Sequence, residues 1–238
     1  MKAKPLFDLL KSFFKNLIRV NQCMACQIII RSRGYFCDSC RARIKRQRSP
    51  CRLCGLEHQT NEAICAACLY DPPHWDSMAV PLQYDGLVRD LLSRLKYSDD
   101  LPIAEWLTEE TKANFDVIAI KPDIIIPVPL YKERLIERGY NQAFEIARCL
   151  SSQLGIPVDS KSLIRKRHTD SQAGLTAKKR EKNLIGAFAF DNRKQYQHVA
   201  VVDDIVTTGS TLNEITRVIK RSGVQTVSVW GLARVEKY

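Results

Sequence analysis

One segment of the chain combines acidic, hydroxyl and glycine residues in an order that suits a phosphorylated ligand. An apolar run, Val199–Val202, leads into two acids and an apolar pair, followed by a hydroxyl-rich turn: Asp203, Asp204, then Thr207, Thr208, Gly209, Ser210 and Thr211. The glycine allows close approach of the backbone, and the hydroxyls and N–H groups at the start of the helix expected next can donate to a phosphate. The two carboxylates would repel a phosphate but suit the hydroxyls of a neighbouring diol and a Mg²⁺ ion.

Eight of the nine cysteines form four Cys-x-x-Cys pairs, with ten residues between each pair and the next. Two residues between cysteines let both thiolates face one ion, and two such pairs complete a tetrahedral four-sulfur shell. We therefore expect two zinc ions, both structural because a full shell leaves no open position. The expected ligands are Cys23, Cys26, Cys37, Cys40, Cys51, Cys54, Cys65 and Cys68. The ninth cysteine, Cys149, falls on an apolar helix face and is expected in the core.

The spacing leaves the pairing of the cysteines open. Sequential pairing closes shorter loops and is favoured over a cross-braced arrangement. Iron–sulfur ligation is the less favoured chemistry, because nothing else in the sequence indicates redox work. Paired cysteines without a secretory signal are typical of metal sites in a reducing compartment, so we expect a cytoplasmic protein. No stretch approaches the ~20 apolar residues that a membrane-spanning helix needs.

The basic charge of the chain is concentrated toward its start. The formal net charge is +11, and residues 1–72 hold thirteen Lys and Arg against five Asp and Glu. Each zinc with four thiolates carries a net charge of about −2, so two sites would lower the excess of +8 in this region to about +4. The densest cluster is Arg41, Arg43, Lys45, Arg46 and Arg48. It is interpreted either as a solvated face that offsets the thiolates or as a contact for single-stranded DNA.

An α/β domain is expected to position these groups. Apolar runs of strand length at Asp123–Val128, Val199–Val202 and Val224–Leu232 alternate with helices expected over Gln142–Leu154 and Thr211–Arg221. This order predicts a doubly wound, mostly parallel sheet, which binds ligands at the carboxyl ends of its strands. Upstream, residues 77–84 are expected to form an edge strand interrupted by a proline, followed by helices over residues 87–97 and 105–118. Residues 165–183 carry no strong period and are expected to form a surface loop.

The expected organisation has three parts. Residues 1–20 have the spacing of an amphipathic helix, residues 21–70 form a double zinc-ribbon module, and residues 74–238 form the α/β domain. Asp71-Pro72-Pro73 is a stiff junction and marks the boundary.

The segment from Val199 to Thr211 resembles the phosphoribosyl pyrophosphate (PRPP) signature of type I phosphoribosyltransferases almost position for position. Two more segments extend the resemblance: Ile124–Leu130 leading to Arg134 and Arg138-Gly139-Tyr140-Asn141-Gln142, and Arg165–Thr169 followed by Gln172, Leu175, Arg180, Asn183 and Gly186-Ala187-Phe188. With the cysteine pairs, they make the chain similar to the ComF family of competence-related proteins, which includes GntX-like members. Tyr140 stands where phenylalanine is common in that family.

The resemblance implies a type I phosphoribosyltransferase fold and assigns roles to residues. Thr207–Thr211 would hold the 5′-phosphate of PRPP, and Asp203 and Asp204 its ribose hydroxyls, with Mg²⁺. Arg134 and Arg138 would lie on the pyrophosphate side, where guanidinium groups bind such oxygens bidentately. The 165–180 loop resembles the flexible loop that closes over the ligand, which makes Arg165, Arg167 and Gln172 candidate catalytic residues.

Two functions follow from the resemblance. One is a role in DNA uptake by natural transformation, in which the protein binds PRPP and handles single-stranded DNA in the cytoplasm, with DNA-uptake or recombination proteins as partners. The other is an active phosphoribosyltransferase, although no pocket for an acceptor base is recognisable in the sequence. A regulatory relative that binds PRPP without chemistry is a third reading, because a fold does not fix a function.

Overall fold

The computed structural model describes residues 21–30, 34–59, 62–116, 120–167 and 183–236, and the chain divides into two compact units, residues 1–44 and 45–238. The helix expected over residues 1–20 lies outside the described residues. The first unit contains an antiparallel pair of short strands, β1 (Asn21–Gln22) and β2 (Ile29–Ile30), and a short helix, α2 (Asp38–Ala42). The first four paired cysteines belong to this unit.

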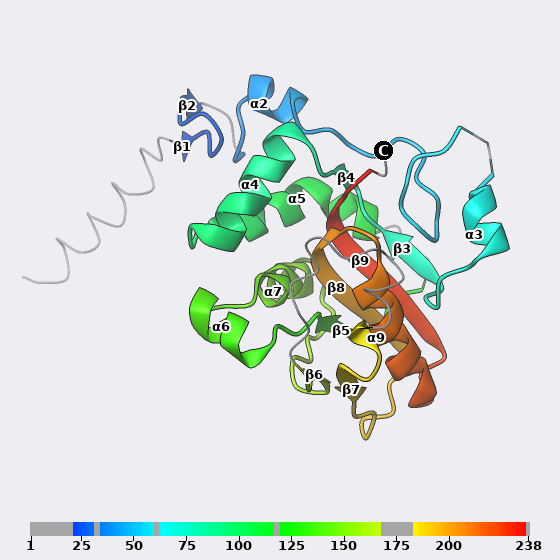
Figure 1. The fold of residues 1–238 in the computed structure, drawn as a ribbon. Coiled ribbons are helices and arrows are strands. Elements are labelled where there is room, and N and C mark those ends of the chain that lie inside the picture. The colour runs from blue at the N-terminus through cyan, green and yellow to red at the C-terminus, as the bar shows by residue number, and fades with distance from the viewer. Residues whose placement is uncertain (1–20, 31–33, 60–61, 117–119, 168–182, 237–238) are drawn as a thin grey trace, which may run out of the picture. The chain divides into compact units, whose positions relative to one another are not determined.

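The second unit is built on a parallel sheet with the strand order β3-β9-β8-β5 (Figure 1). Its strands are β3 (Ser77–Ala79), β5 (Ile124–Pro127), β8 (His198–Val206) and β9 (Thr226–Arg234), and β4 (Leu82–Gln83) also pairs with β9. Every pairing in this sheet is parallel. The central strands are almost continuously apolar because both of their faces are covered. Pro81, which has no N–H to donate, separates β3 from β4 at the edge of the sheet, as expected.

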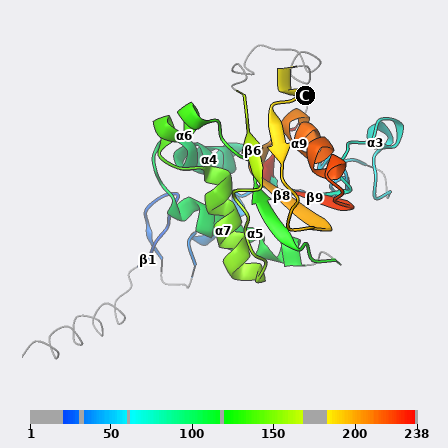
Figure 2. The ribbon, with the colours of Figure 1, turned by 90° about the horizontal axis from the view of Figure 1, so that it is seen from below.

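Helices cover both faces of the sheet (Figure 2). On one face, α7 (Gln142–Leu154) lies against β5 and β8, α5 (Pro102–Asp116) packs beside it, and α4 (Gly86–Tyr97) packs against α5. On the other face lies α9 (Ser210–Arg221). The Asn141 side chain caps α7 by accepting from the Ala143 N–H, and Gly155 ends that helix in the left-handed conformation. The expected doubly wound, mostly parallel sheet is therefore confirmed.

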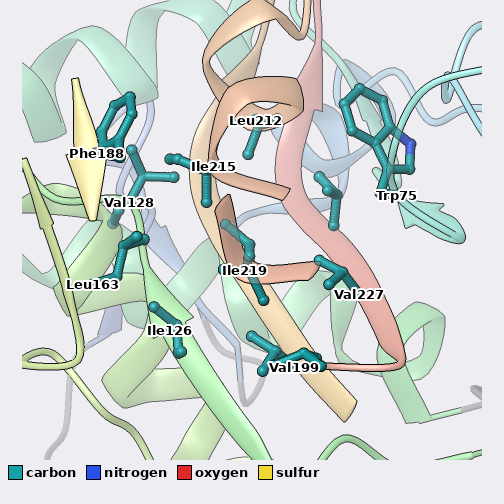
Figure 3. Close-up of a cluster of buried hydrophobic side chains, with 14 of the residues drawn as sticks. Trp75, Ile126, Val128, Leu163, Phe188, Val199, Leu212, Ile215, Ile219 and Val227 are labelled. Carbon is teal, nitrogen blue, oxygen red and sulfur yellow. The ribbon is translucent and has the colours of Figure 1, made fainter. Parts of the chain in front are cut away.

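The core between α9 and the sheet also holds a side chain from outside both elements (Figure 3). Leu212, Ile215 and Ile219 of α9 meet the apolar side chains of β5, β8 and β9. Trp75 joins the same cluster and is 6% exposed. Trp75 follows the last cysteine pair in the chain, so the segment after the second set of cysteines is part of this core.

Several short elements had no signal in the sequence. These are α3 (Ala66–Tyr70), α6 (Lys132–Arg138), β6 (Leu163–Arg165) and β7 (Phe188–Phe190). Strands β6 and β7 pair antiparallel and flank residues 165–183, the segment that the sequence assigned to a surface loop; Arg165 is the residue they share with it. Residues 168–182 between the arms lie outside the described residues.

Candidate phosphate site and metal centres

The loop between β8 and α9 requires a glycine for two reasons. Gly209 has a φ of +81°, and a Cβ added there would lie 2.9 Å from Cη2 of Trp75. A side chain at this position would therefore be strained and would collide with a buried ring. The indole of Trp75 therefore lies directly under the loop, at the glycine that precedes α9.

Hydroxyl groups line the turn above this floor. The Thr208 and Ser210 hydroxyl oxygens lie 3.0 Å apart, and the Ser210 N–H points to the Thr208 hydroxyl at 3.4 Å. Thr207 is exposed and Thr211 is half-buried. Hydroxyl and N–H donors at the start of this 12-residue helix favour the binding of an anion, because the helix dipole adds to their hydrogen bonds.

The two acids at the end of β8 are in different surroundings. Asp203 is half-buried, whereas Asp204 is buried and lies 2.8 Å from the Lys96 ammonium. Burial raises the pKa of Asp203 well above its usual range, and the neighbouring charge of Asp204 raises it further. Burial lowers the pKa of Lys96, but the charge of Asp204 outweighs that effect, and the net pKa is raised. The site thus includes Lys96, whose positive charge offsets the negative charge of the buried Asp204 and which no sequence motif indicated.

The candidate pyrophosphate-side and catalytic residues divide into two groups. Burial, and then the positive charge of Arg134, lower the pKa of Arg165, while Asp203 opposes them, so these three residues are near enough to interact electrostatically. The Arg165 guanidinium lies 5.6 Å from the centre of the Phe188 ring. Arg165 of the first group therefore lies within electrostatic reach of both Arg134 and Asp203.

The second group, Arg138 and Arg167, makes its contacts with other parts of the chain. Arg138 donates to Gln142 at 2.5 Å and lies over the Tyr97 ring. Arg167 donates to the backbone carbonyls of Asn183 at 2.7 Å and Ile185 at 3.1 Å, which joins the two ends of the 168–182 loop. Gln172 lies outside the described residues.

The cysteines gather in two sequential sets of four. Within each set the Sγ atoms all lie within 4.8 Å of one another, and Cys26–Cys37 and Cys54–Cys65 are each 3.8 Å apart. Four sulfurs at about 2.3 Å from a tetrahedral zinc would lie ~3.8 Å apart, so both sets fit the ion. Burial raises the pKa of Cys51, but N–H groups of the backbone outweigh it and lower that pKa to about 7. The structure thus has the sequential grouping and two sets of ligands compatible with structural zinc.

The two sets are copies of one local structure, 28 residues apart in the sequence from Cys23 to Cys51. In each set, the residue after the first Cys-x-x-Cys pair takes a left-handed conformation, with a φ of +61° at Gln27 and +68° at Gly55. The third cysteine of each set precedes a five-residue helix, α2 or α3. The cysteine pairs recur every fourteen residues in the sequence, and the structure shows that the repeating unit contains two pairs and therefore has twice that period.

The second set is joined directly to the phosphate loop. Trp75, whose ring lies under Gly209, donates its indole N–H to the Leu53 carbonyl at 2.5 Å. Arg234, 3% exposed, donates through Nε to the Cys54 carbonyl at 2.7 Å and through Nη1 to the carbonyls of Val206 and Thr207. Two buried side chains therefore connect the backbone between the cysteines with the loop at the end of β8. The sequence placed both cysteine sets in one module, residues 21–70, whereas the second set lies in the same compact unit as the sheet.

The basic run is also divided between the two units. Arg41 and Arg43 belong to the first and are exposed. In the second, Lys45 pairs with Asp85 at 2.5 Å and Arg46 with Glu110 at 3.2 Å, while Arg48 is exposed. Lys45 and Arg46 are therefore engaged by acids at the start of α4 and on α5.

Comparison with known proteins decides the family. The model of the phosphoribosyl transferase domain matches residues 140–236, which include the loop and both acids. Competence protein F of Haemophilus influenzae is 38% identical over 211 residues, which is 83% of this chain and 90% of that protein. The chain belongs to the ComF family. Two other relatives of this ComF-family chain are DNA utilization protein YhgH of Salmonella typhimurium (34% identity; 89% of this chain, 96% of that protein) and Competence protein ComFC of Bacillus subtilis (30%; 79% and 78%).

A solved purine phosphoribosyltransferase from Pyrococcus horikoshii covers 63% of this chain and 86% of its own, with 18% identity and a TM-score of 0.32. The phosphoribosyltransferase fold of the ComF-family chain rests on the parallel sheet and on the domain match. None of the helices within the described residues has the length and apolar character to cross a bilayer.

Proposed function

We propose that this protein binds PRPP with Mg²⁺ at the loop after β8 and acts in DNA uptake in the cytoplasm, where it handles single-stranded DNA. One observation carries the ligand assignment. Two acids and a hydroxyl-rich turn meet at the carboxyl end of a buried strand, and a buried tryptophan fixes the glycine between the turn and the helix.

The chemistry of this arrangement matches the parts of PRPP. The hydroxyls and N–H groups of residues 207–211 suit its 5′-phosphate, and the carboxylates of Asp203 and Asp204 suit its ribose hydroxyls. Its pyrophosphate would face Arg134 and Arg165, whose mutual repulsion an anion relieves. Mg²⁺ would accompany the pyrophosphate, since it is commonly bound through one or two carboxylates and substrate phosphates.

The ligand assignment is tested by thermal unfolding and titration calorimetry with PRPP and MgCl₂. At a concentration a hundred times the dissociation constant, PRPP should stabilise the folded protein by about 2.7 kcal/mol. Asp203→Asn keeps the size of the side chain and should abolish most of this gain. A melting temperature that does not respond to millimolar PRPP in the wild type would rule the assignment out.

The role in DNA uptake rests on the relatives, which are named for competence and for DNA utilization, and on the basic charge of the chain. Arg41 and Arg43 are exposed at the start of the basic run, and we take them as the candidates for phosphate contacts. Binding to single-stranded DNA should be insensitive to sequence and sensitive to salt. Neutralising about three phosphates gives a log–log salt slope near −2.

The double change Arg41→Ala with Arg43→Ala should flatten this slope by roughly 1.4 and leave PRPP binding intact. Lys161→Ala with Arg221→Ala removes the same charge from two exposed positions elsewhere and serves as the matched control. Equal affinities for DNA in the two double variants would exclude Arg41 and Arg43 as contacts.

A transferase activity is the second candidate function. It is favoured by the position of Arg165, on an arm of the β6–β7 hairpin and within electrostatic reach of Asp203. A cation carried on such a loop could stabilise a leaving pyrophosphate. Release of pyrophosphate from PRPP in the presence of candidate nitrogen acceptors separates an enzyme from a protein that only binds.

A further inference from the structure

The short helix α3, in the second copy of the repeat, presents apolar side chains to solvent. Of its five residues only Cys68, a candidate metal ligand, is buried, whereas Ala66, Ala67, Leu69 and Tyr70 are exposed. Leu69 is 67% exposed and Tyr70 is 93% exposed. The helix lies at the edge of the second unit in both views of the chain (Figure 1, Figure 2). Its outer surface is therefore apolar and accessible.

The first copy of the repeat shows that the local structure does not need these apolar residues. Helix α2 occupies the equivalent position 28 residues earlier, and its four non-cysteine residues are also exposed. They are Asp38, Ser39, Arg41 and Ala42. Three of the four are polar or charged, yet the helix and the four-sulfur grouping are both present. Packing within the repeat therefore does not explain the leucine and the tyrosine of α3, and clustered apolar side chains at a surface are typical of an interaction site.

The stretch of chain around α3 carries only negative charge. The 36 residues between Arg52 and Arg89 contain no Lys or Arg, although the chain as a whole has 37 of them in 238 residues. The same stretch contains five acids, and two of these, Glu62 and Asp71, flank α3 in the sequence. Both are exposed, and neither has an ion pair within the described part of the chain. A zinc ion with four thiolates adds a further charge of about −2.

We propose that α3 is a docking surface for a partner protein that presents a basic amphipathic segment. Apolar side chains of that segment would lie on Leu69 and Tyr70, and its Lys or Arg side chains would lie near Glu62 and Asp71. Charge complementarity selects this class of partner, because the acids and the thiolate centre attract cations and repel the phosphates of DNA. An apolar centre with a charged rim is the usual anatomy of a protein interface. The surface does not depend on the ligand proposed for the loop after β8.

The first test is titration calorimetry of the zinc-loaded full chain with three synthetic amphipathic peptides of equal length. One is built of leucine and lysine, one of leucine and glutamate, and one of serine and lysine. The leucine–lysine peptide should bind, and the other two should bind much more weakly because each lacks one half of the complementary surface. If the leucine–lysine peptide does not bind, or if either of the others binds as tightly, the proposal is wrong.

Two double variants locate the binding on α3. Leu69→Ser with Tyr70→Ser should weaken binding of the leucine–lysine peptide about tenfold or more, because burial of either side chain is worth at least that factor. Ile120→Ser with Ile136→Ser is the matched control, since these two side chains are 72% and 71% exposed elsewhere in the second unit. Equal affinities in the two double variants would overturn the proposal. Zinc content measured on the same samples shows that the repeat is intact.

Reversal of the charge tests the acidic half of the surface. Glu62→Lys with Asp71→Lys should shift the preference of the protein from the leucine–lysine peptide to the leucine–glutamate peptide. This variant keeps every residue of the PRPP loop, so its affinity for PRPP should equal that of the wild type. An unchanged preference between the two peptides would contradict the proposed class of partner.

Other occupants of α3 would give different results. If the wild type self-associates in sedimentation velocity and Leu69→Ser with Tyr70→Ser does not, the surface belongs to a second copy of the chain and the proposal fails. A photoreactive amino acid at position 70 should crosslink in cells to a protein segment rich in Lys or Arg and apolar residues. Crosslinks to nucleic acid or to an acidic segment would overturn the proposal.

Discussion

Loss of the second metal centre should weaken PRPP binding, whereas loss of the first should not. The perturbation is Cys54→Ser with Cys65→Ser, and the matched control is Cys26→Ser with Cys37→Ser. These pairs occupy equivalent positions in the repeat, and each pair of Sγ atoms is 3.8 Å apart. Both double variants lose two ligands of one ion, so they differ in which centre is lost.

The size of the effect follows from the contacts between the second centre and the loop. Trp75 donates to the Leu53 carbonyl, and the charged Arg234 donates to the Cys54 carbonyl. A neutral hydrogen bond contributes about 0.5–1.5 kcal/mol and a charged one about 1.5–3, so the two together hold the loop by roughly 2–4 kcal/mol. Part of this energy will be lost from ligand binding, and we expect affinity for PRPP with Mg²⁺ to fall by about 10- to 100-fold.

The assay is titration calorimetry of PRPP with MgCl₂ on the zinc-loaded wild type and on both double variants, with metal content measured on the same samples. Far-ultraviolet circular dichroism shows whether the sheet unit remains folded. The result that refutes this reasoning is an equal affinity for PRPP in the two variants when each has lost one zinc. If the control variant alone lost PRPP binding, the connection through Trp75 and Arg234 would also be excluded.

Three further outcomes are expected at the loop and the acids. Gly209→Ala should destabilise the protein by about 1–3 kcal/mol in thermal unfolding and should weaken PRPP binding. Gly223→Ala is the control: Gly223 has a φ of +94°, but no atom lies near the position of its Cβ, so this variant should lose only the free energy of the backbone strain. Because the pKa of Asp203 is raised, its contribution to stability is greatest below its unfolded pKa of about 3.9 and is lost as the pH rises through the folded pKa. Asp203→Asn should therefore raise the melting temperature at neutral pH, and the gain should shrink toward about pH 4. Lys96→Met should leave a buried carboxylate uncompensated, so MgCl₂ should stabilise this variant more than the wild type in the same assay.

The sequence predicted the elements that carry strong periodicity. The helix over Gln142–Leu154 was placed at its observed bounds, and the apolar strands β5, β8 and β9 were recognised with ends shifted by one to four residues. Helix α6 was missed because none of its seven residues is buried, so no apolar face marks it.

Long-range partners of the site were not predictable in the same way. Lys96 lies more than a hundred residues from Asp204 in the sequence, and Arg234 reaches both Cys54 and Thr207. No spacing rule connects such positions, because folding of the sheet alone brings them together. The loop motif was visible since its residues are adjacent in the chain, whereas the residues that support it are contributed by α4, β9 and the segment before β3.

The 28-residue repeat has a consequence for the history of this family. The copy of the repeat at Cys51–Cys68 is held to the sheet unit by hydrogen bonds from Trp75 and Arg234. The copy at Cys23–Cys40 belongs to the other compact unit. Selection on the sheet unit therefore constrains the two copies unequally. ComF-family chains that keep a single set of four cysteines should retain the set equivalent to Cys51–Cys68, together with the tryptophan and the arginine. The other copy is the one free to diverge or disappear, and sequences of such chains would show which was kept.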